Sequence, residues 1–375
     1  MAGYHADADA TCAPSTNRMP FRRLKTLKTL LVTALLLGGA ELSVRARAWY
    51  RHGAAGPVAN IYEEDPVLGR RIRAGAVLAG HRRNLSVNRW GFRGPDIPLE
   101  KPPGTIRIAT LGESTTFGLE ARDNESVWPA RLWQQLARNR PSLRFDFINA
   151  AVPGYTIDRC ARVLYDRVTD FKPDIITILA ATADITAQCR KQFARSTTHG
   201  ESAAWPSRLF HDHSLLYNLL RVNTAGVRSE LTPQHRDRRL EQRGVDHFAE
   251  TLDQMVRFAS RRGIHVVLCT YPRSFGDPTA PTPQATLGQS ALANNPALTL
   301  AGLNDAYDRY NEAIRTVAAR HTVTLVDLDR LIPRRKTYFH DAIHFSDSGH
   351  QLVAQVIART LNPALPGGKM ARGDR

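Results

Sequence analysis

Three side chains of this sequence could form one nucleophilic site. Ser114 lies in the stretch GESTT at 112–116, and Asp341 and His344 stand three residues apart near the end of the chain. A serine hydroxyl is almost never ionised at neutral pH, so it needs an imidazole to accept its proton and an acceptor to fix the imidazole tautomer. We therefore expect Ser114 as the nucleophile, His344 as the base and Asp341 as the partner of His344.

Either motif alone is weak evidence. Serines in turns are mostly caps or loop residues, and one Asp-x-x-His is expected by chance in a chain of 375 residues. The two motifs gain weight from their positions, because they lie at opposite ends of a single pattern of alternating strands and helices.

The elements that must position these residues can be predicted from apolar spacing. Strands are expected at 106–111, 145–148, 174–180, 264–270 and 323–328, and helices at 131–138, 158–168, 248–261, 304–320 and 349–361. The near-continuous apolar segment 174–180 is typical of a parallel sheet that is covered on both faces. The pattern predicts an α/β fold, a three-layer α/β/α sandwich around a five-stranded parallel sheet.

Two long excursions interrupt this pattern. Residues 189–245 are a polar insertion rich in arginine and histidine, and residues 278–298 form a second long loop. Excursions at the strand ends of such a sheet commonly shape substrate sites.

The N-terminal region indicates a membrane segment. A basic tail at 1–28 precedes an apolar stretch at 29–44, which predicts a signal-anchor with its N-terminus in the cytoplasm. A cleaved signal is the alternative, because Gly38-x-Ala40 resembles a cleavage site, and a buried core helix is a third reading. Residues 45–104 are expected to be a linker and an N-terminal extension, in which NRWGFRG at 88–94 stands out, and 363–375 a C-terminal tail.

The net charge of the chain limits the classes of molecule that it is expected to bind. The formal net charge is +16 at pH 7, but the arginines are scattered and no nucleic-acid-binding motif is present, so we expect no nucleic-acid partner. Anionic lipid headgroups or an acidic polysaccharide fit this charge better than nucleic acid, and a simply arginine-rich composition fits it best. We expect neither a cofactor nor a metal site.

Three stretches resemble known sequence blocks. Residues 107–118 (RIATLGESTTFG), 149–155 (NAAVPGY) and 341–350 (DAIHFSDSGH) resemble the first, second and last blocks of the SGNH (GDSL-like) hydrolases, and the N-terminal segment resembles bacterial membrane-anchored members. The resemblance implies a flavodoxin-like fold over 105–362 and hydrolysis of ester or acyl bonds. It also implies that the N–H groups of Ser114 and Gly154 bind the oxyanion, beside the roles given above.

One block departs from the family pattern. The third block of the family carries Gly-x-Asn-Asp, and its asparagine donates to the oxyanion, whereas residues 181–184 here read ATAD and place Ala183 at that position. The Thr182 hydroxyl could replace this donor, the two backbone donors could suffice, or catalysis could be weakened or lost. Glu113 replaces the aspartate of Gly-Asp-Ser, and we do not expect it to touch the substrate.

Together these residues predict a serine esterase of the cell envelope. It would form an acyl-enzyme from a small acyl ester, such as an O-acetyl group of an envelope glycan, with its catalytic domain on the periplasmic side of the inner membrane. The alternatives are an O-acyltransferase on the same scaffold and a catalytically weakened protein that binds a glycan or a partner. The oligomeric state is left open.

Several other residues have plainer interpretations. We expect His340 at the rim of the site, His350 in a structural role, and Trp90, Trp128 and Trp133 in packing. His211 and His213 lack a third metal ligand. A disulfide between Cys160 and Cys189 is left open, Cys269 is expected to be buried, and Cys12 has no evident partner.

Overall fold

A computed structural model of the chain describes residues 21–52, 61–196, 214–217, 219–220, 239–276, 288, 291–292 and 294–365. The tail before residue 21, Cys12, the His211 and His213 pair and most of the predicted insertion and of the C-terminal tail lie outside these residues.

The core is a parallel sheet of five strands in the order β6-β5-β7-β8-β9. The strands are β5 (Thr105–Gly112), β6 (Arg144–Asn149), β7 (Ile175–Leu179), β8 (His265–Cys269) and β9 (Thr324–Val326). Every residue of β7 is buried, as a central strand covered on both faces requires. The winding reverses between β5 and β7, and the crevice at such a reversal is where α/β sheets bind ligands.

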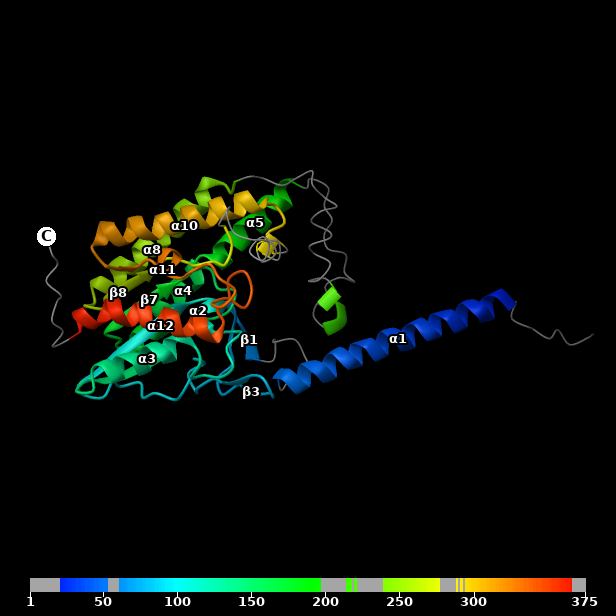
Figure 1. Cartoon of the computed structure of the whole chain (residues 1–375), viewed down its shortest axis with the longest axis horizontal. Helices are drawn as coiled ribbons and strands as arrows, with labels where there is room; N and C mark the ends of the chain where they lie inside the picture. The colour runs from blue at the N-terminus through cyan, green and yellow to red at the C-terminus, as the bar shows by residue number, and fades with distance from the viewer. Residues whose placement is uncertain are drawn as a thin grey trace, which may run out of the picture.

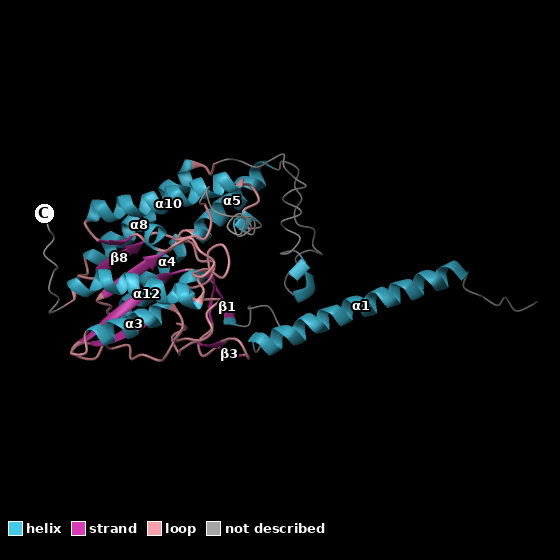
Figure 2. Ribbon diagram, in the orientation of Figure 1, coloured by secondary structure: helices cyan, strands magenta, loops and turns pink. Residues whose placement is uncertain are grey.

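Helices cover both faces of this sheet (Figure 1, Figure 2). On one face α3 (Trp128–Asn139) packs against α12 (Asp347–Leu361). The other face carries α4 (Ile157–Val163), α5 (Thr182–Ser196), α8 (Gln242–Ser260) and α10 (Leu300–His321). The predicted three-layer α/β/α sandwich with a five-stranded parallel sheet is confirmed.

Two predicted boundaries, one of a helix and one of the polar insertion, were wrong in detail. The single helix expected over 158–168 is α4 followed by a π-helical turn, Leu164–Val168, and a 3-10 turn, Thr169–Phe171. The polar insertion was expected from Cys189, but α5 continues to Ser196. Its polar residues are compatible with a helix that has one buried face, so polarity alone did not mark its end.

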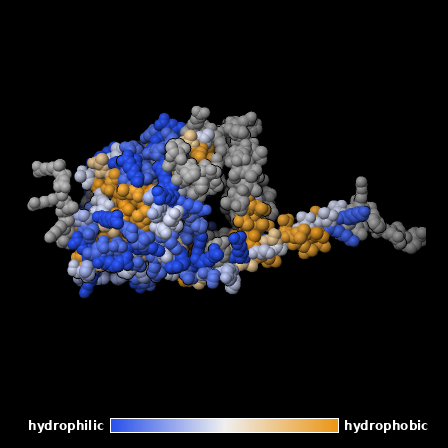
Figure 3. Space-filling model, in the orientation of Figure 1, coloured by the Kyte–Doolittle hydropathy of each residue, from blue (hydrophilic) through white to orange (hydrophobic). Residues whose placement is uncertain are grey.

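The N-terminal segment forms one unbroken helix, α1 (Phe21–His52), which projects from the body of the protein (Figure 1). Residues Lys25–Tyr50 are long and apolar enough to cross a membrane, and none of the apolar window is buried. Figure 3 shows these apolar side chains exposed along the helix. The exposure does not fit the alternative of a buried core helix. At the end of α1 the His81 N–H donates to the Tyr50 carbonyl at 3.0 Å, and the two rings stack.

The N-terminal extension contains two antiparallel hairpins, β1 (Tyr62–Asp65) with β2 (Gly69–Ile72) and β3 (Val77–Ala79) with β4 (Asn84–Ser86). After them comes the GFRG element at 91–94, whose Arg93 is 2% exposed. Its guanidinium donates to the carbonyl oxygens of Phe117 at 3.0 Å and Gly118 at 2.6 Å. These bonds satisfy the end of the short helix α2 (Ser114–Phe117), so the extension helps to position the turn that carries Ser114.

Candidate active site

The nucleophile candidate lies at the reversal of the sheet. Strand β5 ends at Gly112, and α2 begins at Ser114. A Cβ at Gly112 would lie 2.3 Å from the Leu179 carbonyl oxygen of β7, so only glycine permits this close approach of the two strands. The sharp exit from β5 leaves Ser114 half-buried at the lip of the crevice.

Ser114, His344 and Asp341 are brought together, although 230 residues separate the serine from the histidine. His344 Nε2 lies 2.8 Å from Ser114 Oγ, and His344 Nδ1 lies 2.7 Å from Asp341 Oδ2. With the Nδ1 proton donated to the carboxylate, Nε2 presents its lone pair to the serine hydroxyl. The arrangement can remove a proton from Ser114 and return it to a leaving group.

The Asp341 carboxylate is held in its ionised form. Burial acts to raise its pKa, but hydrogen bonds from the His344 ring and from the N–H groups of His344 and Ile343 outweigh this effect, and the pKa of Asp341 lies below its usual value. An ionised Asp341 both fixes the tautomer of His344 and stabilises its protonated ring.

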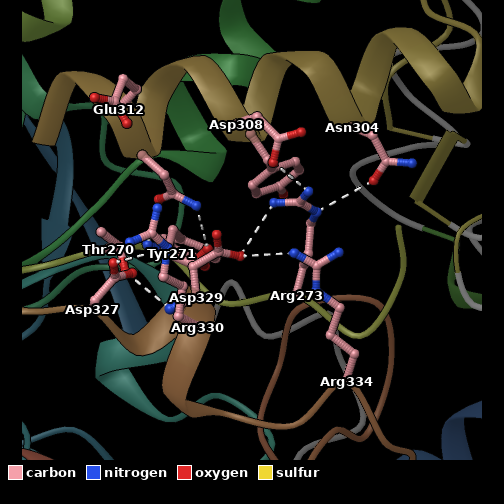
Figure 4. A network of polar contacts seen from close by, with 12 residues as sticks. Thr270, Tyr271, Arg273, Asn304, Asp308, Glu312, Asp327, Asp329, Arg330 and Arg334 are labelled. Carbon is pink, nitrogen blue, oxygen red and sulfur yellow. Dashed lines mark hydrogen bonds and ion pairs between the residues drawn. The ribbon is translucent and has the colours of Figure 1, made fainter. Parts of the chain in front are cut away.

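A polar network holds the Asp341 loop from behind. The Ser274 hydroxyl donates to the carbonyl oxygens of Asp341 and Ala342, each at 3.1 Å. The neighbouring Arg273 is 2% exposed and pairs with Asp308 at 2.6 Å and Asp329 at 3.3 Å (Figure 4). The segment after β8 is thus fixed to α10 and to α11 (Leu328–Leu331), and it fixes Asp341 in turn.

Two backbone N–H groups are free to face a developing oxyanion. Those of Ser114 and Gly154 donate to no backbone acceptor within the described part of the chain, and both residues line one cavity with His344. Gly154 has a left-handed φ of 79°, which turns the chain directly after Pro153. Backbone donors in such positions are the usual components of an oxyanion hole.

The third-block residues are committed to other contacts. The N–H groups of Ala181, Thr182 and Ala183 all donate to the Glu113 carboxylate, at 3.0, 2.8 and 2.7 Å. The Thr182 hydroxyl lies 2.8 Å from the Tyr307 hydroxyl. When Tyr307 donates in that pair, the Thr182 proton remains available to a ligand in the cavity.

Glu113 therefore has a larger role than the sequence suggested. It caps the N-terminus of α5, whose first N–H groups have no partner within the helix. Burial raises the pKa of its carboxyl to about 7, although the three N–H donors and the nearby His344 act in the opposite direction. In the sequence, only the long acidic side chain beside the nucleophile pointed to this contact, because no helix was predicted to begin at Thr182.

The cavity beside Ser114 has a volume of about 800 Å³. Its walls are mainly small or polar, and its largest uncharged side chains are Tyr307 and Ile343. Volumes of this order accommodate a ligand of several rings.

Comparison with known proteins identifies the family. The sequence profile of the GDSL-like lipase/acylhydrolase family matches residues 110–352. The chain belongs to this family. It is accordingly an esterase or acylhydrolase, a hydrolase that acts on ester bonds. A search of curated proteins finds no match to the chain.

Solved structures resemble this GDSL-like esterase in fold. One is an α/β hydrolase enzyme from the metagenome of Lake Arreo, with 18% identity, a TM-score of 0.42, and coverage of 68% of this chain and 94% of that one. The acetyl xylan esterase AlAXEase has 15% sequence identity and a TM-score of 0.42, and the match covers 68% of this chain and 100% of that one. A catalytic mutant of Axe2, an acetylxylan esterase from Geobacillus stearothermophilus, has 16% identity and a TM-score of 0.43, and the match covers 72% of this chain and 97% of that one. At these values the likeness concerns the fold alone.

Two further histidines, His340 just before the last block and His350 within it, lie outside the proton path of the GDSL-like esterase. His340 is exposed, and its Nε2 lies 3.5 Å from Glu120. His350 is buried and accepts the Trp128 N–H at 3.2 Å. Burial and the charge of Arg93 lower the pKa of His350 to about 3, so it stays neutral and structural.

The tryptophans and cysteines also serve packing. Trp128 is buried, whereas Trp90 and Trp133 contact Phe171 and Phe147 through their rings. Among the described residues the cysteines Cys160, Cys189 and Cys269 are buried thiols that form no disulfide. The Cys160–Cys189 disulfide that the sequence left open is not formed.

Proposed function

We propose that this GDSL-like esterase removes small acyl groups through an acyl-enzyme, with Ser114 as the nucleophile. The observation that carries the proposal is the continuous hydrogen-bonded path from Ser114 Oγ through His344 to Asp341. Geometry of this kind is the first requirement for general-base activation of a hydroxyl.

The steps follow from the positions of these atoms. Ser114 Oγ attacks the ester carbonyl while His344 Nε2 takes its proton, and the N–H groups of Ser114 and Gly154 hold the oxyanion. The protonated His344 then gives this proton to the departing alkoxide, which leaves the acyl group on Ser114. Water, deprotonated by His344, attacks the acyl-serine, releases the carboxylic acid and restores the hydroxyl.

The cavity walls favour a small acyl group on a hydroxyl-rich carrier. Alanine, threonine and asparagine side chains make up much of the lining, and a long apolar groove is lacking among the described residues. An O-acetyl group on an envelope glycan meets these conditions. The exposed apolar helix α1 supports a membrane-anchored protein of the bacterial type, with this domain on the periplasmic side.

Hydrolysis of p-nitrophenyl acetate by the full-length protein in detergent tests the proposal. Ser114→Ala should lower kcat by about a thousandfold or more, because it removes the hydroxyl that is proposed to form the acyl-enzyme. Ser43→Ala removes an exposed serine hydroxyl on α1 and should leave the rate unchanged. A Ser114→Ala protein with full activity would contradict the mechanism.

The same assay separates the alternatives. Addition of an acceptor glycan that diverts the acetyl group from water would identify an O-acyltransferase. The presence of Ala183 in place of an oxyanion donor favours the second alternative, a weakened enzyme that binds a glycan or partner. Absence of labelling of Ser114 by a fluorophosphonate probe would support that alternative.

Ala183 itself provides a test of the oxyanion site. If Ser114 and Gly154 supply only backbone donors, Ala183→Asn should add a third and raise kcat about tenfold or more, with little change in KM. An unchanged or lower rate would indicate that Thr182 already fills this role. Thr182→Val should then lower kcat.

A further inference from the structure

Four cationic side chains surround the candidate active site. Arg70 comes from β2, Arg159 from α4, and Arg190 and Lys191 from α5, and all four line the cavity that contains Ser114. Each is exposed, and none forms an ion pair with a carboxylate of the described residues. We call these four residues the cationic rim.

None of the three carboxylates that line the same cavity forms an ion pair with the rim, because each is hydrogen-bonded elsewhere. Asp341 accepts from His344, and Glu113 accepts from three N–H groups at the start of α5. Asp158 is bound by the His247 ring at 2.9 Å and by the Thr251 hydroxyl at 3.2 Å. The lining therefore carries four cations against three carboxylates, and its cations remain open to an anionic ligand.

The rim residues approach the reacting position from two sides. Arg70 donates to the Pro153 carbonyl at 3.3 Å, and a Cβ on Gly154 would lie 3.1 Å from its guanidinium. Arg159 lies beside it, with its guanidinium 5.7 Å from the centre of the Tyr155 ring.

Helix α5 supplies the opposite side of the rim. Its cavity-lining residues recur at helical spacing, from Ala183 through Thr186 and Ala187 to Arg190 and Lys191. One face of α5 thus runs from the reacting centre to the cations, because side chains three and four residues apart share a helix face.

We propose that the substrate of this site is an acylated acidic glycan, whose sugar carboxylates flank the ester and bind the cationic rim. This inference rests on the proposed esterase function and names its substrate class. Uncompensated guanidinium and ammonium groups at a cavity mouth match carboxylates, and arginine can bind them through two parallel hydrogen bonds. The small polar walls fit a hydroxyl-rich chain, and the part of the cavity that the described residues form has no apolar groove for the tails of a phospholipid.

The test compares oligosaccharides of matched length and acetylation. The acidic member is acetylated oligogalacturonate, and the neutral member is acetylated xylo-oligosaccharide. We expect kcat/KM at about 50 mM salt to be at least roughly tenfold higher for the acidic substrate, and this advantage to shrink at about 500 mM as salt screens the rim. The neutral substrate should show little dependence on salt. Equal kcat/KM for both substrates would overturn the inference and leave the esterase function intact.

Rim variants make the test specific to these residues. Arg159→Gln and Lys191→Gln should each lower the acidic-to-neutral ratio of kcat/KM severalfold. Arg359→Gln removes the same charge from the last turn of α12, outside the cavity, and should leave this ratio unchanged. A similar fall of the ratio in Arg359→Gln would show that the preference for the acidic substrate comes from the net charge of the protein, and it would overturn the role of the rim.

Binding separates this inference from the catalytic proposal. If no substrate is turned over, the esterase function fails, but calorimetry with Ser114→Ala still measures the affinity for the two oligosaccharides. Salt-sensitive binding of oligogalacturonate alone would support the rim, and equal or absent binding would overturn it. Stronger competition by phosphatidylglycerol vesicles than by oligogalacturonate would overturn it in favour of a lipid ligand.

Discussion

Arginines gather in two regions of this GDSL-like esterase, and their partners differ. Behind the Asp341 loop, Arg273 pairs with the Asp329 carboxylate (Figure 4), which Arg315 also contacts, and Arg315 pairs with Asp327 as well. At the cationic rim the positive groups meet no carboxylate of the described residues. The same side chain is thus a structural element where it is paired and buried, and a potential ligand-binding group where it is left open to water.

The paired region is also the more deeply buried. Arg273 is 2% exposed, and the Asp329 side chain, which contacts three arginines, is 8% exposed. Removal of a buried arginine breaks several charge-assisted hydrogen bonds of the network at once, which costs more than the loss of an exposed charge. The comparison therefore predicts opposite outcomes for arginine substitutions in the two regions.

The largest effect is expected for Arg273→Met, which removes the central cation of the network. We expect the free energy of unfolding, measured by urea denaturation, to fall by about 2 to 3 kcal/mol, because buried charge-assisted hydrogen bonds to Asp308 and Asp329 are lost. Arg334→Met is the control, because its side chain is 25% exposed, against 2% for Arg273, and it should cost less. A loss below about 1 kcal/mol for Arg273→Met would remove the distinction between the regions.

A second prediction compares carboxyl groups of the two regions. In the network, burial acts to raise the pKa of Asp327, but bonds from Arg315 and Thr270 lower it below its usual value. Beside Ser114, burial raises the pKa of Glu113 from 4.5 to about 7. Between these pH values the folded state holds the Glu113 proton while the unfolded chain has released it, so this contribution to stability falls as pH rises and levels off above about 7.

The measurement is the difference in unfolding free energy between wild type and each variant across pH. For Glu113→Gln this difference should decrease as pH rises from 4.5 to about 7. For Asp327→Asn it should be constant near neutrality and decrease only as pH falls below the usual value of 3.8. If this difference changed with pH in the same way for both variants, the assignment of a raised pKa to Glu113 and a lowered pKa to Asp327 would be contradicted.

The smallest effect is expected at the rim. Arg190→Gln should change the free energy of unfolding by less than about 0.5 kcal/mol, because an exposed cation without an ion pair contributes little to folding. Urea denaturation of this variant beside Arg273→Met compares the two regions directly. A loss of more than about 1 kcal/mol in Arg190→Gln would place this residue among the structural arginines.

The strands of the sheet could be predicted from the sequence because the spacing of apolar residues directly reflects which positions are buried. It also placed Ser114 and the Asp341–His344 pair at strand ends, where a parallel sheet brings such residues to one edge. It could not show that Glu113 caps α5 or that Arg93 holds the end of α2. These contacts join residues that are distant in the chain, and one partner in each is a backbone group, an N–H for Glu113 and a carbonyl for Arg93, which every sequence carries alike.

The unbroken helix α1 determines how far this enzyme can reach. At 1.5 Å per residue its 32 residues form a rod of about 48 Å, and the contact of Tyr50 with His81 joins that rod to the domain. With the proposed membrane segment 29–44 in the bilayer, the helix beyond it lifts the domain only about 12 Å. A rigid helix, unlike a flexible linker, fixes both the distance of the domain from the membrane and its orientation. The cavity would therefore sample one thin layer above the membrane, and the insertion of a single helical residue after Val44 would turn its opening by about 100°.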